Sequence, residues 1–152
     1  LPAICFLGGL WLAGCGAPPR ALPTPAPTAP VPAFVAAPAS QSLPALVIAE
    51  RHAAATGDLD TLAQLWAADA RIVDGRSTPD PADDYVWAGR AAILDRYRLA
   101  VFPNPPPRLA AGDLQTATVE LAGDQATLIR NGDRWRFVRQ AGRWWLLELR
   151  YD

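Results

Sequence analysis

Residues 116–151, TATVELAGDQATLIRNGDRWRFVRQAGRWWLLELRY, decide the fold of this chain. Runs rich in β-branched and aromatic residues follow one another here, with short turn-forming segments between them. The clearest turn is Asn131-Gly132, because Asn-Gly between two such runs is typical of a tight β-hairpin. The pattern predicts an antiparallel meander with strands at residues 116–121, 126–130, 134–139 and 143–151.

The last of these runs, RWWLLELRY, alternates with the period of two that a strand has. Its two faces would be formed by Trp145, Leu147, Leu149 and Tyr151 and by Trp144, Leu146, Glu148 and Arg150. We expect the first face, which is wholly apolar or aromatic, to pack against helices or to line a cavity. The second face is mixed and would suit a dimer interface, where Trp and Arg are enriched.

Helical patterns precede the strands. Residues 46–56 (LVIAERHAAAT) are rich in alanine and end at Gly57, and Asp58 is a good N-cap for a second helix. Helical spacing then places four apolar residues on one face of that second helix: Leu59, Leu62, Ala63 and Trp66.

A short strand is expected at residues 71–74, followed by a polar loop at residues 75–84. A third helix would run from Gly89 to about Phe102, with Tyr97 on its apolar face. Because helices come first and a run of strands comes last, the order is typical of an α+β fold, with helices on one face of a curved sheet.

The N-terminal residues have the pattern of an export signal. Residues 1–12 (LPAICFLGGLWL) are an uncharged apolar run that is too short to span a bilayer. The sequence Leu12-Ala13-Gly14-Cys15 that follows resembles the bacterial lipobox. The resemblance implies cleavage after Gly14, a lipid on Cys15, and attachment to a membrane of the cell envelope on the side away from the cytoplasm.

We therefore divide the chain into three parts. These are a lipoprotein signal peptide at residues 1–14, the lipidated Cys15 with a tether at 15–45, and a folded domain at 46–152. The tether is assigned because most of the 16 prolines lie before residue 46, and such a composition favours an extended spacer.

Charge and composition exclude some functions. The net charge of the 152 residues is −1, whereas a nucleic-acid-binding domain normally has a basic excess, so no nucleic-acid partner is expected. His52 is the only histidine, Cys5 would be lost with the signal peptide, and Cys15 would be lipidated. A typical zinc site therefore cannot form, and we expect neither a metal ion nor a cofactor.

Several short motifs together resemble the nuclear-transport-factor-2-like (NTF2-like) superfamily, in its SnoaL-like branch. They are Gly57-Asp58, Trp66-Ala67-Ala68-Asp69-Ala70, Trp87-Ala88-Gly89-Arg90 and Gly142-Arg143-Trp144-Trp145. The resemblance covers residues 46–152 and implies a cone, in which three N-terminal helices pack on a strongly curved antiparallel sheet and leave a pocket at the open end. Members include isomerases, cyclases and dehydratases as well as binding modules without catalysis, and they are often homodimers through the sheet.

The resemblance also suggests site residues. The candidates for lining the pocket around a small apolar or amphipathic ligand are Trp66, Trp87, Tyr97 and Trp145. The catalytic candidates are Asp74 as a general base, with Tyr85 or His52 as its partner. Each also has a structural interpretation: Asp74 as an exposed carboxylate at a strand end, His52 as a partly buried helix residue, and Tyr97 as a core residue.

Two functions remain open at this point, besides a purely structural role in the assembly of the cell envelope. The first is a membrane-anchored binding module for a small ligand or a protein partner. The second is a small acid–base enzyme of the isomerase, cyclase or dehydratase type. An apolar cone would favour binding, whereas a buried pair of ionisable groups inside it would favour catalysis.

Overall fold

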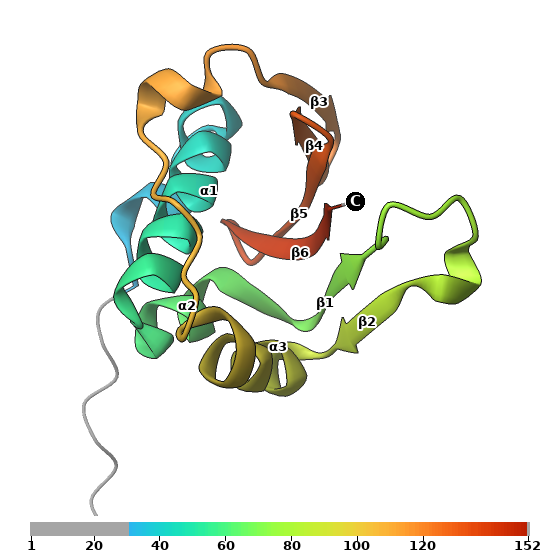
Figure 1. Cartoon of the computed structure of the whole chain (residues 1–152). Coiled ribbons are helices and arrows are strands. Elements are labelled where there is room, and N and C mark those ends of the chain that lie inside the picture. Colours follow the sequence, from blue (N-terminus) through green and yellow to red (C-terminus); the bar gives the residue numbers. More distant parts are fainter. Residues whose placement is uncertain (1–30, 152) are drawn as a thin grey trace, which may run out of the picture.

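The computed structural model describes residues 31–151 (Figure 1). Its helices are α1 (Ala39–Thr56), α2 (Leu59–Leu65) and α3 (Arg90–Arg96), and α3 continues into a π-helical turn at Tyr97–Val101. Short 3₁₀ turns lie at Ala33–Ala36, Pro81–Asp83 and Ala111–Leu114. The strands are β1 (Trp66–Asp74), β2 (Tyr85–Ala88), β3 (Thr118–Ala122), β4 (Gln125–Arg130), β5 (Asp133–Gln140) and β6 (Arg143–Tyr151). The proposed lipidation site, Cys15, lies outside the described residues.

The strands form one six-stranded sheet in the order β2-β1-β6-β5-β4-β3, which curves around α1 (Figure 1). This arrangement confirms the α+β class and the cone shape. All neighbouring strands are antiparallel except β1 and β6, which run parallel. The sheet is therefore mixed, because the chain passes through β2, α3 and the meander before it returns to lie beside β1.

The C-terminal meander has the expected strands and turns. Asn131 and Gly132 connect β4 to β5 with φ values of 52° and 90°, the left-handed conformation that Asn-Gly hairpins require. Helix signals were equally informative: α1 is capped by Gly57 with a φ of 73°, and the Asp58 carboxylate accepts a hydrogen bond of 3.0 Å from the Thr61 backbone N–H at the start of α2. The sequence predicted this turn and these caps correctly because each depends only on residues that are close together in the sequence.

Ordered structure begins before the domain boundary placed at Leu46. Helix α1 begins at Ala39 and carries Pro44 inside it. Val35 and Leu43 are buried in the same core as the rest of the domain. The proline-rich stretch that indicated a tether therefore extends into the folded part, where Pro44 lies in the early turns of α1.

Trp66 is in a strand, which corrects its assignment to the face of the second helix. Helix α2 ends at Leu65, and Trp66 opens β1 with extended backbone angles (φ −84°, ψ 134°). Strand β1 is thus longer than the predicted 71–74, and Trp66 pairs with Leu146 of β6. Pairing with a distant strand overrides the helical spacing. The short strand β2, which was not predicted, forms the antiparallel partner of β1.

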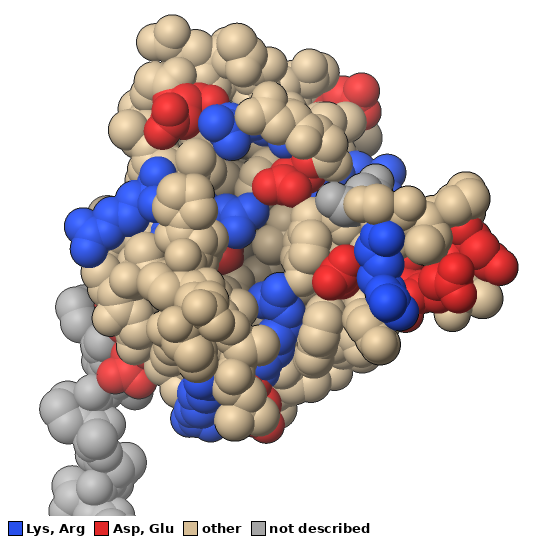
Figure 2. Space-filling model, in the orientation of Figure 1, with Lys and Arg blue, Asp and Glu red and all other residues tan. Residues whose placement is uncertain are grey.

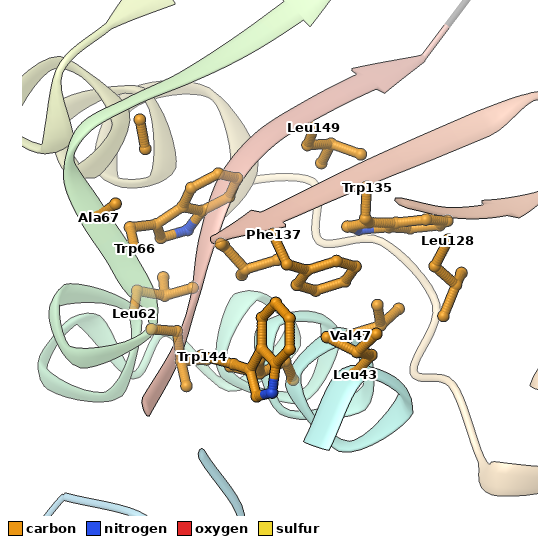
Figure 3. Packing of buried hydrophobic residues seen from close by; sticks show 14 of the residues in the cluster. Leu43, Val47, Leu62, Trp66, Ala67, Leu128, Trp135, Phe137, Trp144 and Leu149 are labelled. Carbon is orange, nitrogen blue, oxygen red and sulfur yellow. The ribbon is translucent and has the colours of Figure 1, made fainter. Parts of the chain in front are cut away.

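A bulge in β6 corrects the predicted faces of this strand. Arg136 pairs with Glu148 while Phe137 pairs with Leu146, so Leu147 is an extra residue without its own partner. Trp144 and Leu146 lie on the buried side before the bulge, and Leu149 lies on it afterwards. Strict alternation therefore gives the wrong face for the first half of the strand. Figure 3 shows Trp144 packed with Phe137, Trp66 and Trp135 in the core.

Candidate ligand-binding cavity

A cavity of about 370 Å³ lies inside the cone. It is bounded by α1, by the sheet and by the α3 segment, which is α3 together with the π-helical turn that continues it (residues 90–101). Its polar walls are formed by Glu50, Arg51, Arg96, Tyr97, Asp133 and Tyr151, and its apolar walls include Val101, Pro106 and Leu149. In Figure 2, acidic and basic side chains surround a hollow at the centre of the face shown. The cavity therefore offers charged groups and apolar surface to the same occupant.

Glu50 is the most deeply buried carboxyl group of the cavity. It is fully buried on the face of α1 that also carries Leu46 and Val47. The Tyr97 hydroxyl donates a hydrogen bond of 2.5 Å to Glu50 Oε1. Burial raises the pKa of Glu50, and the Arg51 guanidinium and the Tyr97 hydrogen bond oppose this effect only in part. Glu50 is thus a carboxyl group that holds its proton to a higher pH than usual.

Burial and the neighbouring Glu50 also raise the pKa of Tyr97 well above its ordinary value. Its hydroxyl therefore keeps its proton and remains a donor to Glu50. The pair joins α1 to the π-helical turn at Tyr97–Val101, since Tyr97 is the first residue of that turn.

Arg51 links the cavity wall on α1 to β5. Its Nη2 donates to Asp133 Oδ2 at 3.0 Å, and its guanidinium lies 5.5 Å from the centre of the Trp135 ring. Its Nε is 3.6 Å from Glu50 Oε2, beyond hydrogen-bond distance. Arg51 therefore has its own carboxylate partner and provides Glu50 with a favourable field only.

Arg96 has a different environment. Its guanidinium lies over three aromatic rings, 4.7 Å from the centre of Trp87, 5.5 Å from Tyr151 and 6.0 Å from Tyr97. It donates a hydrogen bond to the Tyr151 hydroxyl. Within residues 31–151, no carboxylate lies at ion-pair distance from Arg96. The aromatic rings fix the position of this cation without neutralising it.

The comparisons with known proteins concern the fold. No protein-family model and no curated protein matches the chain. Among solved structures, an NTF2-like superfamily protein from Salmonella enterica superposes with a TM-score of 0.55, at 12% identity over 74% of this chain and 88% of that chain. This chain has the NTF2-like fold.

Two further structures agree. One is an NTF2-like protein with a cystatin-like fold from Novosphingobium aromaticivorans, with a TM-score of 0.52 and 22% identity over 71% of this chain and 77% of that chain. The other is an NTF2-like protein of unknown function from Silicibacter pomeroyi, with a TM-score of 0.51 and 22% identity over 72% of this chain and 91% of that chain. Identities this low establish the NTF2-like fold alone, so function has to be argued from the cavity.

Within the NTF2-like cone, the three catalytic candidates are only partly together. Asp74 and Tyr85 are opposite each other in the β1–β2 pair, and Asp74 is also next to Tyr151 of β6. Asp74 accepts a hydrogen bond of 2.9 Å from the backbone N–H of Arg76, and Tyr85 is 55% exposed. His52 lies on the exposed side of α1 and makes no contact with either in the described part of the chain.

Of the four residues expected to line the pocket, Tyr97 does so. Trp87 is half-buried and is not among the residues that line the cavity, although its ring contacts Arg96, which does line it. Trp66 is completely buried in the core. Trp145 is a correction: the β6 bulge places it on the face opposite Leu149, where its ring packs 3.7 Å from the Arg143 guanidinium and 5.5 Å from that of Arg90.

Sequence reasoning missed Glu50, Arg51, Arg96 and Asp133. For Glu50 a signal was present, because helical spacing puts this carboxyl group on the apolar face of α1 with Leu46, Val47, Ala53 and Ala54. A charged residue at a core position of a helix indicates a function or a specific partner. Arg96 gave no such signal, since its aromatic neighbours come from three separate segments.

Membrane-spanning helices and clusters of metal ligands are both absent from the described residues. No helix within residues 31–151 combines the length and apolar character needed to cross a membrane. Over the same residues, no group of three or more His, Cys, Asp and Glu side chains is placed to hold a metal ion.

Proposed function

We propose that this NTF2-like domain binds a small amphipathic organic molecule inside the cone. The observation that carries the proposal is the cavity of about 370 Å³, which combines Arg96 and Glu50 with the apolar side chains of Val101 and Leu149. Ligand pockets of small molecules have this size range and this combination of apolar walls with a few fixed polar groups.

A pair of matched variants tests the proposal. Val101 lines the cavity, whereas Leu99 lies in the same π-helical turn and is 81% exposed. The fluorescent amphiphile 8-anilinonaphthalene-1-sulfonate should bind the wild type saturably. Val101→Trp should fill the cavity and abolish that binding, and Leu99→Trp should leave it unchanged. Equal binding by both variants, or no saturable binding by the wild type, would contradict the proposal.

We further propose that the domain is held at a membrane outside the cytoplasm by a lipid on Cys15. The support is the lipobox-like Leu12-Ala13-Gly14-Cys15 behind an apolar run. Stable anchoring takes a lipid of two or more acyl chains. Native protein should partition into detergent, and Cys15→Ser should release it or leave it unprocessed. Recovery of soluble native protein with an unmodified Cys15 would refute the anchor.

Catalysis is a second candidate, favoured by the Glu50–Tyr97 pair. Burial raises the pKa of Glu50, and a raised pKa suits a carboxyl group to both donate and accept protons. The proposed acid–base chemistry would then use Glu50 and Tyr97 within the cone, in place of Asp74 with Tyr85 or His52.

This candidate can be separated from simple binding by hydrogen exchange. Small ketones incubated with the protein in D₂O should exchange the hydrogens next to their carbonyl group if Glu50 transfers protons. Glu50→Gln should abolish the exchange and leave binding intact. No exchange above the level of Glu50→Gln for any ketone that binds would favour the binding module.

A further inference from the structure

Two buried polar atoms in this cavity have no hydrogen-bond partner within the described chain. They are Glu50 Oε2 and Arg96 Nε. Both residues line the same cavity. Six other buried atoms of the described chain without a hydrogen-bond partner lie on residues away from the cavity, so the lack of a partner is not enough by itself. What points to a ligand is that a carboxyl oxygen and a guanidinium nitrogen of this kind belong to two residues that line one cavity.

The guanidinium of Arg96 is suited to bind an anionic group. Some arginines of the domain have carboxylate partners, as in Arg51 with Asp133 and Arg71 with Glu148, whereas Arg96 lines the cavity without one at ion-pair distance in the described chain. Arg96 has aromatic rings and the Tyr151 hydroxyl in their place. A guanidinium held rigidly in this way presents its remaining N–H donors in a fixed fork, which matches the two oxygens of a carboxylate.

Glu50 supplies a second donor. Its Oε1 accepts the Tyr97 hydroxyl hydrogen, so in the protonated carboxyl group the proton resides on Oε2, which then donates. An ammonium group would meet the positive charges of Arg51 and Arg96. A neutral alcohol would leave the Arg96 charge unpaired.

We propose, resting on the proposed function, that the ligands of this cavity are small apolar carboxylates, whose carboxylate lies between Arg96 and Glu50 and whose apolar part lies against Val101 and Leu149. Glu50 comes from α1 and Arg96 from α3, while Val101 lies in the π-helical turn that follows Arg96 and Leu149 lies on β6. The selectivity comes from two fixed donors that face one negative charge.

The experiment compares three probes with the same chain: octanoate, 1-octanol and octylamine. Isothermal titration calorimetry is performed on the full chain carrying Cys15→Ser, produced without lipid. Octanoate should bind at least about tenfold more tightly than 1-octanol, because a charged hydrogen-bonded pair is gained, and octylamine should not bind. If 1-octanol binds as tightly as octanoate and Val101→Trp blocks both, the carboxylate proposal fails and the proposed function stands. If neither probe binds, the proposed function fails with it.

Variants assign the selectivity to Arg96. Arg96→Met should remove the preference for octanoate over 1-octanol, and saturable binding of 1-octanol by this variant reports that the cavity is intact. The control is Arg98→Met, because Arg98 is exposed in the same segment and pairs with Asp95. Loss of both probes in equal measure, or an unchanged preference in Arg96→Met, would overturn the role of Arg96.

The contribution of Glu50 has its own readout. The charged and titratable groups around it are Arg51 on α1, Arg96 and Tyr97 in the α3 segment, and Asp133 on β5. Octanoate affinity should fall as pH rises and Glu50 ionises, because two negative charges would then meet. Glu50→Gln keeps an N–H donor at this position, so it should retain octanoate binding and lose this pH dependence. The same pH dependence in Glu50→Gln would overturn the role of Glu50.

Discussion

The domain buries two glutamates, one on each face of the curved sheet, and their surroundings differ. Glu148 projects from the face of β6 opposite the core and is 3% exposed. Its Oε2 lies 2.5 Å from Arg71 Nη2 and 3.6 Å from Arg136 Nη1. Glu50, inside the cone, has a tyrosine hydroxyl as its hydrogen-bond donor, and its Oε2, 3.6 Å from Arg51 Nε, has no hydrogen-bond partner in the described chain.

The surroundings of Glu148 and Glu50 distinguish a structural carboxylate from a candidate functional one. Arg71 and Arg136 both approach Oε2 of Glu148, and Arg71 also donates a hydrogen bond to it, so this carboxylate links β6 to β1 and β5. Glu50 disfavours its own charge by burial and lies beside a cation without a carboxylate partner in the described chain. This difference supports the proposal that the ligand binds on the inner face.

The largest expected effect compares the two faces of β6 through adjacent tryptophans. Trp144 is 2% exposed in the core, so Trp144→Ala should lower the free energy of unfolding by about 3–5 kcal/mol. Trp145 is half-buried against Arg143 and Arg90, so Trp145→Ala should cost only about 1 kcal/mol. Urea denaturation measures both. A larger cost for Trp145→Ala than for Trp144→Ala would mean that the bulge at Leu147 does not switch the faces.

The next effect concerns the two glutamates. Glu148→Gln leaves Arg71 and Arg136 without a counter-charge and should lower the free energy of unfolding at pH 7 by about 2 kcal/mol. Glu50→Gln keeps an acceptor for the Tyr97 hydroxyl and removes an ionisable group from the interior, so its cost should stay below about 1 kcal/mol. A larger loss in Glu50→Gln than in Glu148→Gln would reverse the comparison.

A smaller effect appears in the pH dependence of stability. The pKa of Glu50 is raised above 4.5 in the folded state, so the folded state binds more protons than the unfolded state above that pH. The wild type should therefore lose stability relative to Glu50→Gln as pH rises from 4.5 through the folded-state pKa. The relative stability is measured by urea denaturation of both proteins at each pH.

Asp58 provides a control of opposite sign. Hydrogen bonds from Thr61 lower its pKa below 3.8 in the folded state, so its contribution is lost as pH falls through the folded-state pKa. Wild type and Asp58→Asn should converge in stability at acidic pH. A flat difference between the wild type and Glu50→Gln over the same titration would argue against a burial-shifted Glu50.

The smallest effect separates the two tyrosines considered for the site. Tyr97→Phe removes the donor to Glu50 and should cost about 1 kcal/mol in unfolding free energy. Tyr85 is 55% exposed, so Tyr85→Phe should change stability by less than about 0.5 kcal/mol and leave binding of the fluorescent amphiphile unchanged. Weakened binding in Tyr85→Phe would extend the site to the β1–β2 pair.

The sequence predicted the features whose causes are local. Asn131-Gly132 and Gly57-Asp58 each satisfy a turn or cap within a few residues, and both appear as expected. The face of Trp144 could not be predicted, because one extra residue in β6 shifts the alternation and is visible only in the pairing with β5. Trp66 was misplaced for a related reason, since its strand exists through pairing with β6.

The site was less predictable than the fold. Glu50 could have been found from its position on the apolar face of α1. The surroundings of Arg96 could not, because Trp87, Tyr97 and Tyr151 come from β2, the π-helical turn and β6. Chemistry assembled from distant segments leaves no spacing that a single sequence reveals.

The parallel pairing of β1 with β6 has a consequence for how the chain folds. The sheet neighbours of β1 are β2 and β6. In the sequence, β1 and β6 are separated by β2, α3 and the first three strands of the meander. Contacts between such distant segments form slowly, because a long loop must close before they add any stability. The pairing of β1 with β6 therefore forms only after residues 143–151 have been synthesised. The cone cannot close until β6 has left the ribosome. We expect the nascent chain to expose the apolar residues of β1 throughout that interval, which gives chaperones or an export machinery time to bind it before the cavity exists.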